Sequence, residues 1–118
     1  MTQQSHSRAV NQIVASIQSS FASKAFVMKQ VNGFDGSRKL RYGVPGTCDI
    51  RGYLYGDALA IPFEIEVKTG TGRLERAQAA WLRLCARLHV PHRIASVHSD
   101  DDLDRVVSDT ITWLRSFT

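Results

Sequence analysis

The residues with the clearest chemical potential lie in the segment FEIEVK, residues 63–68. Apolar and charged residues alternate in it, which is the pattern of a β-strand whose successive side chains point to opposite faces. Glu64, Glu66 and Lys68 therefore share one face, and the three apolar residues share the other. Two carboxylates beside an ammonium group can bind a cation and position a water molecule, so this strand is the first candidate for an active site.

The segment before this strand is predicted to be its hairpin partner. Residues 48–55 (CDIRGYLY) alternate in the same way, and Gly56 and Asp57 form a turn signal before a second strand over residues 59–68. Pro62 lacks a backbone N–H, so we expect a bulge or a sheet edge near the start of that second strand. The two strands should pair antiparallel with their apolar faces together.

This hairpin brings a third carboxylate to the charged face. If both apolar faces pack together, the permitted registers place Asp49 opposite Glu64 or, two residues longer, opposite Glu66. Directly opposed Cβ atoms lie about 5 Å apart and diagonal ones about 7 to 8 Å, so in either register Asp49 and Glu66 reach a common cation. Their charges repel each other unless a metal ion or Lys68 compensates. Ligands that are all oxygen atoms favour Mg²⁺ or Mn²⁺.

A polar residue interrupts the apolar face of the next predicted helix, residues 74–89. Gln78 falls inside the apolar arc at about 100° per residue, and Pro91 stops the helix. A buried primary amide costs about 1 to 3 kcal/mol unless it finds hydrogen-bond partners, and polar groups at the end of the sheet would supply them. The arc consists of five apolar residues: Leu74, Ala77, Trp81, Cys85 and Leu88.

Five further segments complete the predicted order. Apolar residues at helical spacing predict an amphipathic helix over residues 7–21, and strand composition follows over residues 25–31. Residues 32–46 are rich in glycine and basic residues and are predicted to form a loop with room for a short strand. Residues 93–97 are predicted as a short strand, and residues 99–117 as a terminal helix with acidic residues in its first turn. The order α-β-β-β-α-β-α indicates an α/β fold, a mixed sheet flanked by helices.

The composition excludes several classes of protein. The chain has 118 residues, 43% of them apolar, which suits a single compact domain over residues 1–118. No apolar run approaches the roughly 20 residues of a membrane span, and the first residues lack the apolar region of a signal peptide. The two cysteines form neither a disulfide framework nor a zinc knuckle. Secreted, membrane and zinc-finger proteins are therefore excluded, and a cytoplasmic protein is favoured.

Basic residues are concentrated in the body of the chain. Residues 1–98 carry 13 Lys and Arg against six Asp and Glu, whereas residues 99–118 carry two against five. A basic body favours a polyanionic partner, because bound phosphates release their condensed counterions. Lys39 and Arg41 in the predicted loop, and Arg73 beside the predicted site, are the candidates for contacts with a DNA backbone.

Three segments in this order, PGTCDI (residues 45–50), EVK (residues 66–68) and LERAQ (residues 74–78), resemble the VRR-NUC nuclease family, a branch of the PD-(D/E)XK phosphodiesterases. The resemblance extends over residues 43–103 and includes the TGTGRL connector and the VPHRIASVHSDDDL stretch. It implies a restriction-endonuclease-like core and Mg²⁺-dependent hydrolysis of DNA, with Mn²⁺ as a substitute.

The resemblance also implies a role for each motif residue. Asp49 and Glu66 match the two carboxylate ligands of the metal, and the carbonyl of Val67 is similar to the backbone ligand. Lys68 matches the lysine that orients or deprotonates the attacking water, and Gln78 resembles the glutamine that supports the site. A metal held in this way polarises the scissile phosphate and lowers the pKa of a bound water. The motif leaves open whether one or two ions bind.

Two departures from the family pattern leave alternatives open. Cys48 stands where the motif usually has proline, directly before the aspartate. Relatives often place an acidic residue on the first helix, whereas no Asp or Glu precedes Asp35 here, so either Gln12 or Gln18 substitutes or no residue does. Glu64 is either an accessory ligand or a charge that faces solvent.

The function favoured by the sequence is a structure-specific DNA endonuclease of replication or repair that acts on a Holliday junction or a flap. The chain has no evident base-reading module, and basic loops read the backbone and shape of DNA. The resemblance implies a homodimer, whose two sites would cut opposite strands, and favours a bacterial or phage-infected cell. The alternatives are a nuclease-like module that binds DNA or protein without cutting, and a sequence-specific restriction or mobile-element endonuclease.

Overall fold

The computed structural model describes residues 3–30, 33–35, 40–42, 44 and 46–118 of the protein. No helix in these ranges is long and apolar enough to cross a membrane. In chain order the elements are α1 (Gln3–Phe21), a 3₁₀ turn (Ala22–Lys24), β1 (Ala25–Lys29), β2 (Gly33–Asp35), β3 (Leu40–Tyr42), β4 (Ile50–Tyr55), β5 (Ala60–Thr69), α2 (Arg76–Arg87), β6 (His92–Val97), a second 3₁₀ turn (Asp100–Asp102) and α3 (Leu103–Arg115).

Four strands form the main sheet, in the spatial order β1-β4-β5-β6, and β2 pairs with β3 in a separate small sheet. Neighbouring strands of the main sheet are antiparallel except β5 and β6, which are parallel because α2 carries the chain back between them. The described residues show the predicted α/β fold, with three α-helices and a four-stranded mixed sheet. When β2 and β3 of the small sheet are left out, the elements follow the predicted order α-β-β-β-α-β-α.

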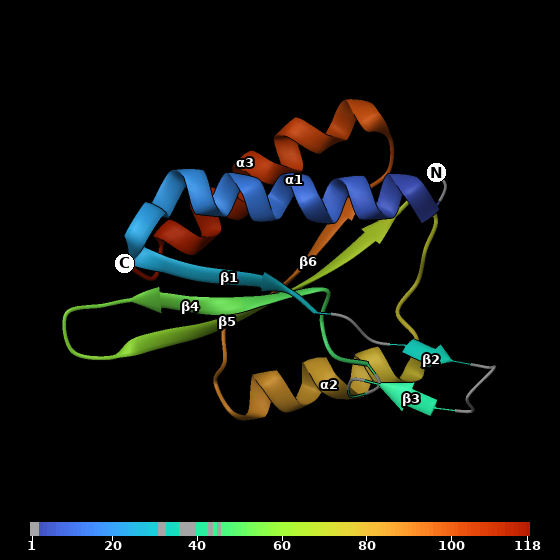
Figure 1. The fold of residues 1–118 in the computed structure, drawn as a ribbon, viewed down its shortest axis with the longest axis horizontal. Coiled ribbons are helices and arrows are strands. Elements are labelled where there is room, and N and C mark those ends of the chain that lie inside the picture. Colours follow the sequence, from blue (N-terminus) through green and yellow to red (C-terminus); the bar gives the residue numbers. More distant parts are fainter. Residues whose placement is uncertain (1–2, 31–32, 36–39, 43, 45) are drawn as a thin grey trace.

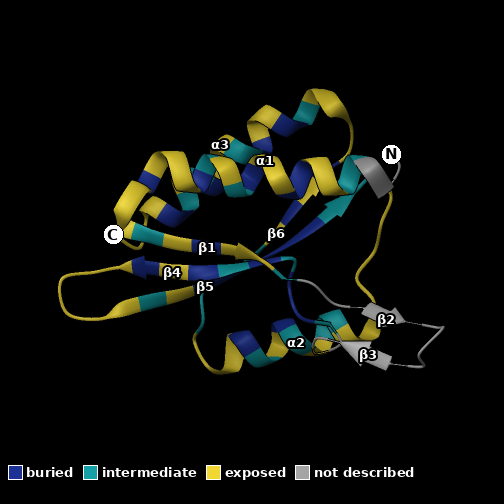
Figure 2. Ribbon diagram, in the orientation of Figure 1, coloured by how far each residue is buried: buried dark blue, intermediate teal, exposed yellow. Residues whose placement is uncertain are grey.

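The helices form layers on both sides of the main sheet. Helices α1 and α3 cover one face, and α2 lies against the other (Figure 1). The main core fills the space between the sheet and the α1–α3 layer, because every second side chain of each strand points there. The band of buried residues runs along α1 and through the middle of the sheet (Figure 2). The largest fully buried apolar side chains of this core are Ile13, Ile17, Ile50, Leu54, Phe63, Ile65 and Leu114.

Several predicted boundaries shift in the structure. The first helix begins at Gln3 rather than residue 7, and the last begins at Leu103, after a 3₁₀ turn, rather than residue 99. Helix α2 is shorter than predicted at both ends. Leu74 and Leu88 therefore lie outside it and are exposed, and Ala77 in its first turn is exposed as well, so the prediction of a buried arc is wrong at these three positions. The described part of residues 32–46 contains the two short strands β2 and β3, where one was expected at most.

The hairpin of β4 and β5 adopts the longer of the two predicted registers. Ile50 pairs with Ile65 and Leu54 with Ile61, so both apolar faces point to the same side of the sheet. Continued by one residue, this register places Asp49 next to Glu66. Pro62 lies in β5 before β6 begins to pair at Glu64, which gives the predicted sheet edge.

Candidate active site

The end of β4 brings a carboxylate onto the backbone of β5. The strand ladder stops at the pair of Ile50 and Ile65, and the Asp49 carboxylate replaces a strand carbonyl as the next acceptor. Its Oδ2 accepts a hydrogen bond of 2.8 Å from the Val67 backbone N–H. The backbone carbonyl of Asp49 accepts a 2.7 Å bond from the N–H of Gln30, just after β1. Asp49 is thus fixed by both neighbouring strands and faces the segment that carries Glu66 and Lys68.

Glu66 is a buried carboxyl group with an unused oxygen. Only 2% of the residue is exposed, and its Oε2 has no hydrogen-bond partner among the residues that the structure describes. Burial, a side-chain hydrogen bond with Asp49 and the Asp49 charge together raise the pKa of Glu66 to about 9, against a weaker opposing effect of Lys68. The carboxyl groups of Asp49 and Glu66 therefore meet, as the hairpin register predicts, at a position where a second negative charge is costly.

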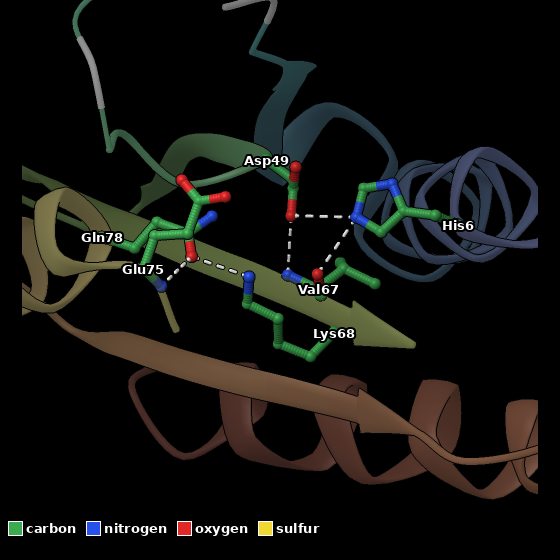
Figure 3. A network of polar contacts seen from close by, with 6 residues as sticks. All are labelled: His6, Asp49, Val67, Lys68, Glu75 and Gln78. Atoms are coloured by element: carbon green, nitrogen blue, oxygen red, sulfur yellow. Dashed lines mark hydrogen bonds and ion pairs between the residues drawn. The ribbon is translucent and has the colours of Figure 1, made fainter. Parts of the chain in front are cut away.

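Lys68 is held in place by the helix on the charged face. Its Nζ donates a 2.7 Å hydrogen bond to Gln78 Oε1, and the same oxygen accepts a 2.8 Å bond from the backbone N–H of Glu75 (Figure 3). Gln78 and Glu75 together form a capping box at the start of α2. The predicted polar partner of the Gln78 amide is thus the lysine of the motif, and one side chain both begins the helix and positions Lys68.

A glycine lets the segment before Asp49 approach α2 closely. Gly46 has a φ of 85°, a conformation that favours glycine, and a Cβ atom there would lie 2.3 Å from the Ala77 carbonyl oxygen. The chain therefore passes directly over the first turn of α2 before it enters β4. This contact brings the segment with Asp49 and the helix with Gln78 to the same end of the sheet.

Glu64 was expected to be either an accessory ligand or a charge that faces solvent, and its environment in the structure fits neither. The residue is 5% exposed, so it does not face solvent. Its Oε1 accepts a 2.7 Å hydrogen bond from the Trp81 indole, and its Oε2 lies 3.6 Å from both Cys85 Sγ and Arg51 Nη2. Burial and the nearby Glu64 carboxylate raise the pKa of Cys85 to about 11. Both oxygens of Glu64 are engaged by neighbouring side chains, which is typical of a structural carboxylate rather than a ligand.

The first helix contributes a residue that the sequence analysis did not single out. Gln12 and Gln18 are exposed, whereas His6 points to the site, with Nε2 3.0 Å from the Val67 carbonyl oxygen and 3.4 Å from Asp49 Oδ2 (Figure 3). A signal for it exists in the sequence. His6 extends the buried stripe of α1 by one turn beyond Val10, so its ring must face the sheet.

The predicted DNA-binding residues are only partly described. Arg73 is exposed in the connector between β5 and α2, on the chain that leaves the site. For Arg41 the structure describes the backbone, in β3. Lys39 lies outside the described residues.

The chain was compared with models of protein families, with curated proteins and with solved structures. No match was found. The resemblance to VRR-NUC nucleases therefore stays a prediction from the motif residues.

The donor set fits a hard divalent cation with an incomplete protein shell. In the described part of the chain, no three His, Cys, Asp or Glu side chains form a group that could hold a metal. The available donors are the Asp49 and Glu66 carboxylates and the Val67 carbonyl. Mg²⁺ is usually bound by one or two carboxylates and keeps several waters or takes phosphate oxygens. The unpartnered Glu66 oxygen is a buried acceptor that such an ion would satisfy.

Proposed function

We propose that this protein is a metal-dependent DNA endonuclease with a restriction-endonuclease-like core, similar to the VRR-NUC branch of the PD-(D/E)XK nucleases. One observation carries the proposal: two carboxyl groups meet at the end of a β-hairpin, and one of them is buried with an unpartnered oxygen. Two carboxyl groups brought together at a buried position are hard to explain as packing, because an apolar pair would cost less. A divalent cation would allow both groups to be ionised, in place of the proton that Glu66 otherwise holds.

In this proposal Asp49, Glu66 and the Val67 carbonyl hold Mg²⁺ or Mn²⁺. A bound ion would polarise the scissile phosphate and make water more acidic, which is the hydrolytic chemistry of such ions. The Val67 N–H orients Asp49 for this role, because it donates a hydrogen bond to Oδ2 from the side of β5. The Glu66 side chain is confined by burial, so its acceptor is pre-positioned and needs no ordering when an ion arrives.

Lys68 acts on the water or on the phosphate. Gln78 takes one of the three N–H groups of its ammonium. The remaining donors can orient the attacking water or bind a phosphate oxygen as negative charge develops on it. Because Gln78 belongs to the capping box of α2, the position of Lys68 is fixed by a helix rather than by a loop.

The substrate in this proposal is DNA, bound through its backbone. The basic excess of residues 1–98 supports a polyanionic partner. Arg73 on the connector, together with Lys39 and Arg41, would contact phosphates near the cut. A branched substrate such as a Holliday junction or a flap, and a homodimer with one site for each strand, are the further parts of this proposal.

A cleavage panel tests the proposal. Four-way junction, flap, duplex and single-stranded DNA are incubated with the protein and Mg²⁺ or Mn²⁺, next to Asp49→Asn, Lys68→Ala and the control Lys24→Ala. Lys24 ends the 3₁₀ turn that follows α1, whereas His6 lies in the first turn of that helix. We expect cutting by the wild type and Lys24→Ala, with losses of about a hundredfold or more in the two site variants.

The panel also separates the alternatives. If the wild type binds DNA but cuts none of the four substrates with either ion, the protein is a non-cleaving module and the nuclease proposal is wrong. Cutting of duplex DNA at one fixed sequence would instead identify a restriction-type or mobile-element endonuclease. Preference for the junction or flap would support the structure-specific function.

A further inference from the structure

The outward face of α2 carries three arginines on one side of the helix. Arg76, Arg83 and Arg87 are all exposed, and at about 100° per residue they fall within an arc of about 40°. Cys85 lies on the opposite side of the helix, where it contacts Glu64 of the sheet. The three arginines therefore lie on the side away from the sheet and form one basic surface, here named the α2 stripe.

The charges of the α2 stripe have no counter-charge nearby. In the described part of the chain, the arginines that form ion pairs are Arg51 and Arg105, and neither belongs to the stripe. Helix α2 itself contains no Asp or Glu. Arg83 and Arg87 are four residues apart, a spacing at which like charges repel and weaken a helix. An anionic partner would remove this repulsion.

The helices on the other face of the sheet differ in charge. Helix α3 and the 3₁₀ turn before it carry five Asp and two Arg, and Arg105 pairs with both Asp102 and Asp109. Helices α1 and α3 cover the face of the sheet opposite α2 (Figure 1). An anionic polymer would therefore be attracted to the α2 side and repelled by α3.

The α2 stripe has the length and composition of a surface for a duplex backbone. Arg76 and Arg87 lie about 16 Å apart along the helix axis, which corresponds to roughly five base pairs at 3.4 Å each. The other exposed residues between them are small: Ala77, Ala80 and Ala86. No bulky side chain holds a phosphate away from this face, and no aromatic ring on it can stack on an unpaired base.

The α2 stripe begins beside the proposed active site. Gln78, in the first turn of α2, accepts the hydrogen bond of Lys68, and Arg76 lies two residues before it. Arg73, on the connector that leaves the site, precedes the stripe by three residues. Arg87 at the other end is about 13 Å from Gln78 along the helix axis. A backbone on the stripe would therefore run away from the cut.

We propose that the α2 stripe binds the sugar-phosphate backbone of a duplex arm of the substrate, over about five base pairs beside the cut. The inference rests on the proposed function and deepens it, because it requires the DNA on this side of the cut to be paired. Contacts to phosphates alone carry no sequence information. The stripe should therefore increase affinity for any duplex.

Binding without cleavage tests the α2 stripe. Fluorescence anisotropy in EDTA measures the affinity of the full-length protein for a duplex of about 20 base pairs and for a single strand of the same length, at a series of salt concentrations. In the stripe variant all three arginines are changed to glutamine, which keeps a good helix former at each position. The control variant loses the same amount of charge elsewhere, through glutamine at Lys24, Arg105 and Arg115. Circular dichroism checks that both variants are folded.

We expect the stripe variant to bind the duplex about tenfold or more weakly than the wild type at about 0.1 M salt, and the control variant to stay within about threefold. The slope of log affinity against log salt should become shallower by about 2 to 3 in the stripe variant, because each phosphate contact to a duplex contributes about 0.9. The stripe variant should lose less affinity for the single strand, whose contacts contribute about 0.7 each.

Three results would overturn the inference. Equal losses in the two variants would mean that only the total charge matters, and a larger loss for the single strand would mean that the bound DNA is unpaired. In the third, the duplex affinity is unchanged. If the stripe variant then also dissociates an oligomer of the wild type in ultracentrifugation, the stripe binds the acidic turn Asp100–Asp102 of a second copy.

The proposed nuclease activity is tested separately from the stripe. If the wild type cuts DNA while one of these three results is found, the nuclease proposal stands and the role of the stripe is wrong. If the stripe variant loses duplex affinity as expected but the wild type cuts none of the panel substrates, the stripe binds DNA and the nuclease proposal is wrong.

Discussion

Two carboxylates of one strand, two residues apart and on the same face, have opposite environments. Glu64 and Glu66 are 5% and 2% exposed, yet Glu64 is engaged at both oxygens and Glu66 has one oxygen without a partner in the described structure. The two carboxylates are therefore equally buried, but they differ in whether their oxygens have hydrogen-bond or ion-pair partners. A buried polar group is normally satisfied, so the unpartnered Glu66 oxygen is the acceptor that the proposed metal ion would engage.

The difference arises from the helix that covers this face. The middle of α2 lies over Glu64 and supplies Trp81 and Cys85, four residues apart and therefore on the same side of the helix. The first turn of α2 supplies only Gln78, which is turned to Lys68. Glu66 faces Asp49 instead of the helix. Within about 7 Å along one strand, the same face of the sheet changes from a carboxylate bound by side chains of α2 to a buried one with an unpartnered oxygen.

The largest expected effect is on cleavage, and it should fall on only one of the two carboxylates. Glu66→Gln removes a proposed metal ligand and should lower the cleavage rate by about a thousandfold, or some 4 kcal/mol of transition-state stabilisation. Glu64→Gln should stay within about fivefold of the wild type, because its carboxylate contacts no reacting group. Single-turnover cleavage rates with Mn²⁺ compare the two. Equal losses would show that the contrast between these residues has no functional meaning.

The second effect is on stability, where Glu66→Gln should be the more stable of the two variants although it is the less active one. In EDTA at pH 8, Glu66→Gln should raise the free energy of unfolding by about 1 to 3 kcal/mol, because the amide does not have to be neutralised or buried as an ion. Glu64→Gln should lower it by about 1 to 2 kcal/mol, because Arg51 loses its ion pair and the buried donors lose an ionised acceptor. Urea unfolding followed by circular dichroism measures both. A destabilised Glu66→Gln would mean that Glu66 is a structural carboxylate after all.

The pH dependence of that stability has a defined sign. The pKa of Glu66 is raised from 4.5 to about 9 by burial and by Asp49, so the folded state holds this proton more tightly than the unfolded chain does. Its contribution to stability is fully present below pH 4.5 and is lost as the pH rises through 9. The increase in the free energy of unfolding that Glu66→Gln gives over the wild type should therefore vanish near pH 4.5 and grow toward pH 9. All of these measurements are made in EDTA.

Much of this contrast was not accessible from the sequence. The alternation in residues 63–68 predicted that both glutamates share the face opposite the core, and the parity of the hairpin limited Asp49 to two registers, of which the structure has the longer. Nothing in the alternation shows that α2 covers only part of that face. Contacts between segments far apart in sequence decide it, and the indole of Trp81 reaches Glu64 across 17 positions.

His6 was missed for a related reason. The family pattern directed attention to acidic residues on the first helix, and the chain has none there. The apolar stripe of α1 marks the side that faces the sheet, and His6 is the polar residue at its end. The helical spacing of that stripe could have predicted that His6 faces the sheet. Its contact with Val67, 61 positions later in the sequence, depends on the fold.

The smallest effect lies at the boundary between the two environments, at Gln78. Gln78→Ala should reduce the cleavage rate by about tenfold, because Lys68 Nζ loses its 2.7 Å acceptor, and should cost about 1 kcal/mol of stability through the lost capping box. Glu75→Ala removes the other half of that box and leaves the acceptor of Lys68 in place. It should show a similar loss of stability with a cleavage rate within about twofold of the wild type. Rates and urea unfolding of both variants separate the two roles, and an equal drop in rate would mean that α2 supports the site only by being folded.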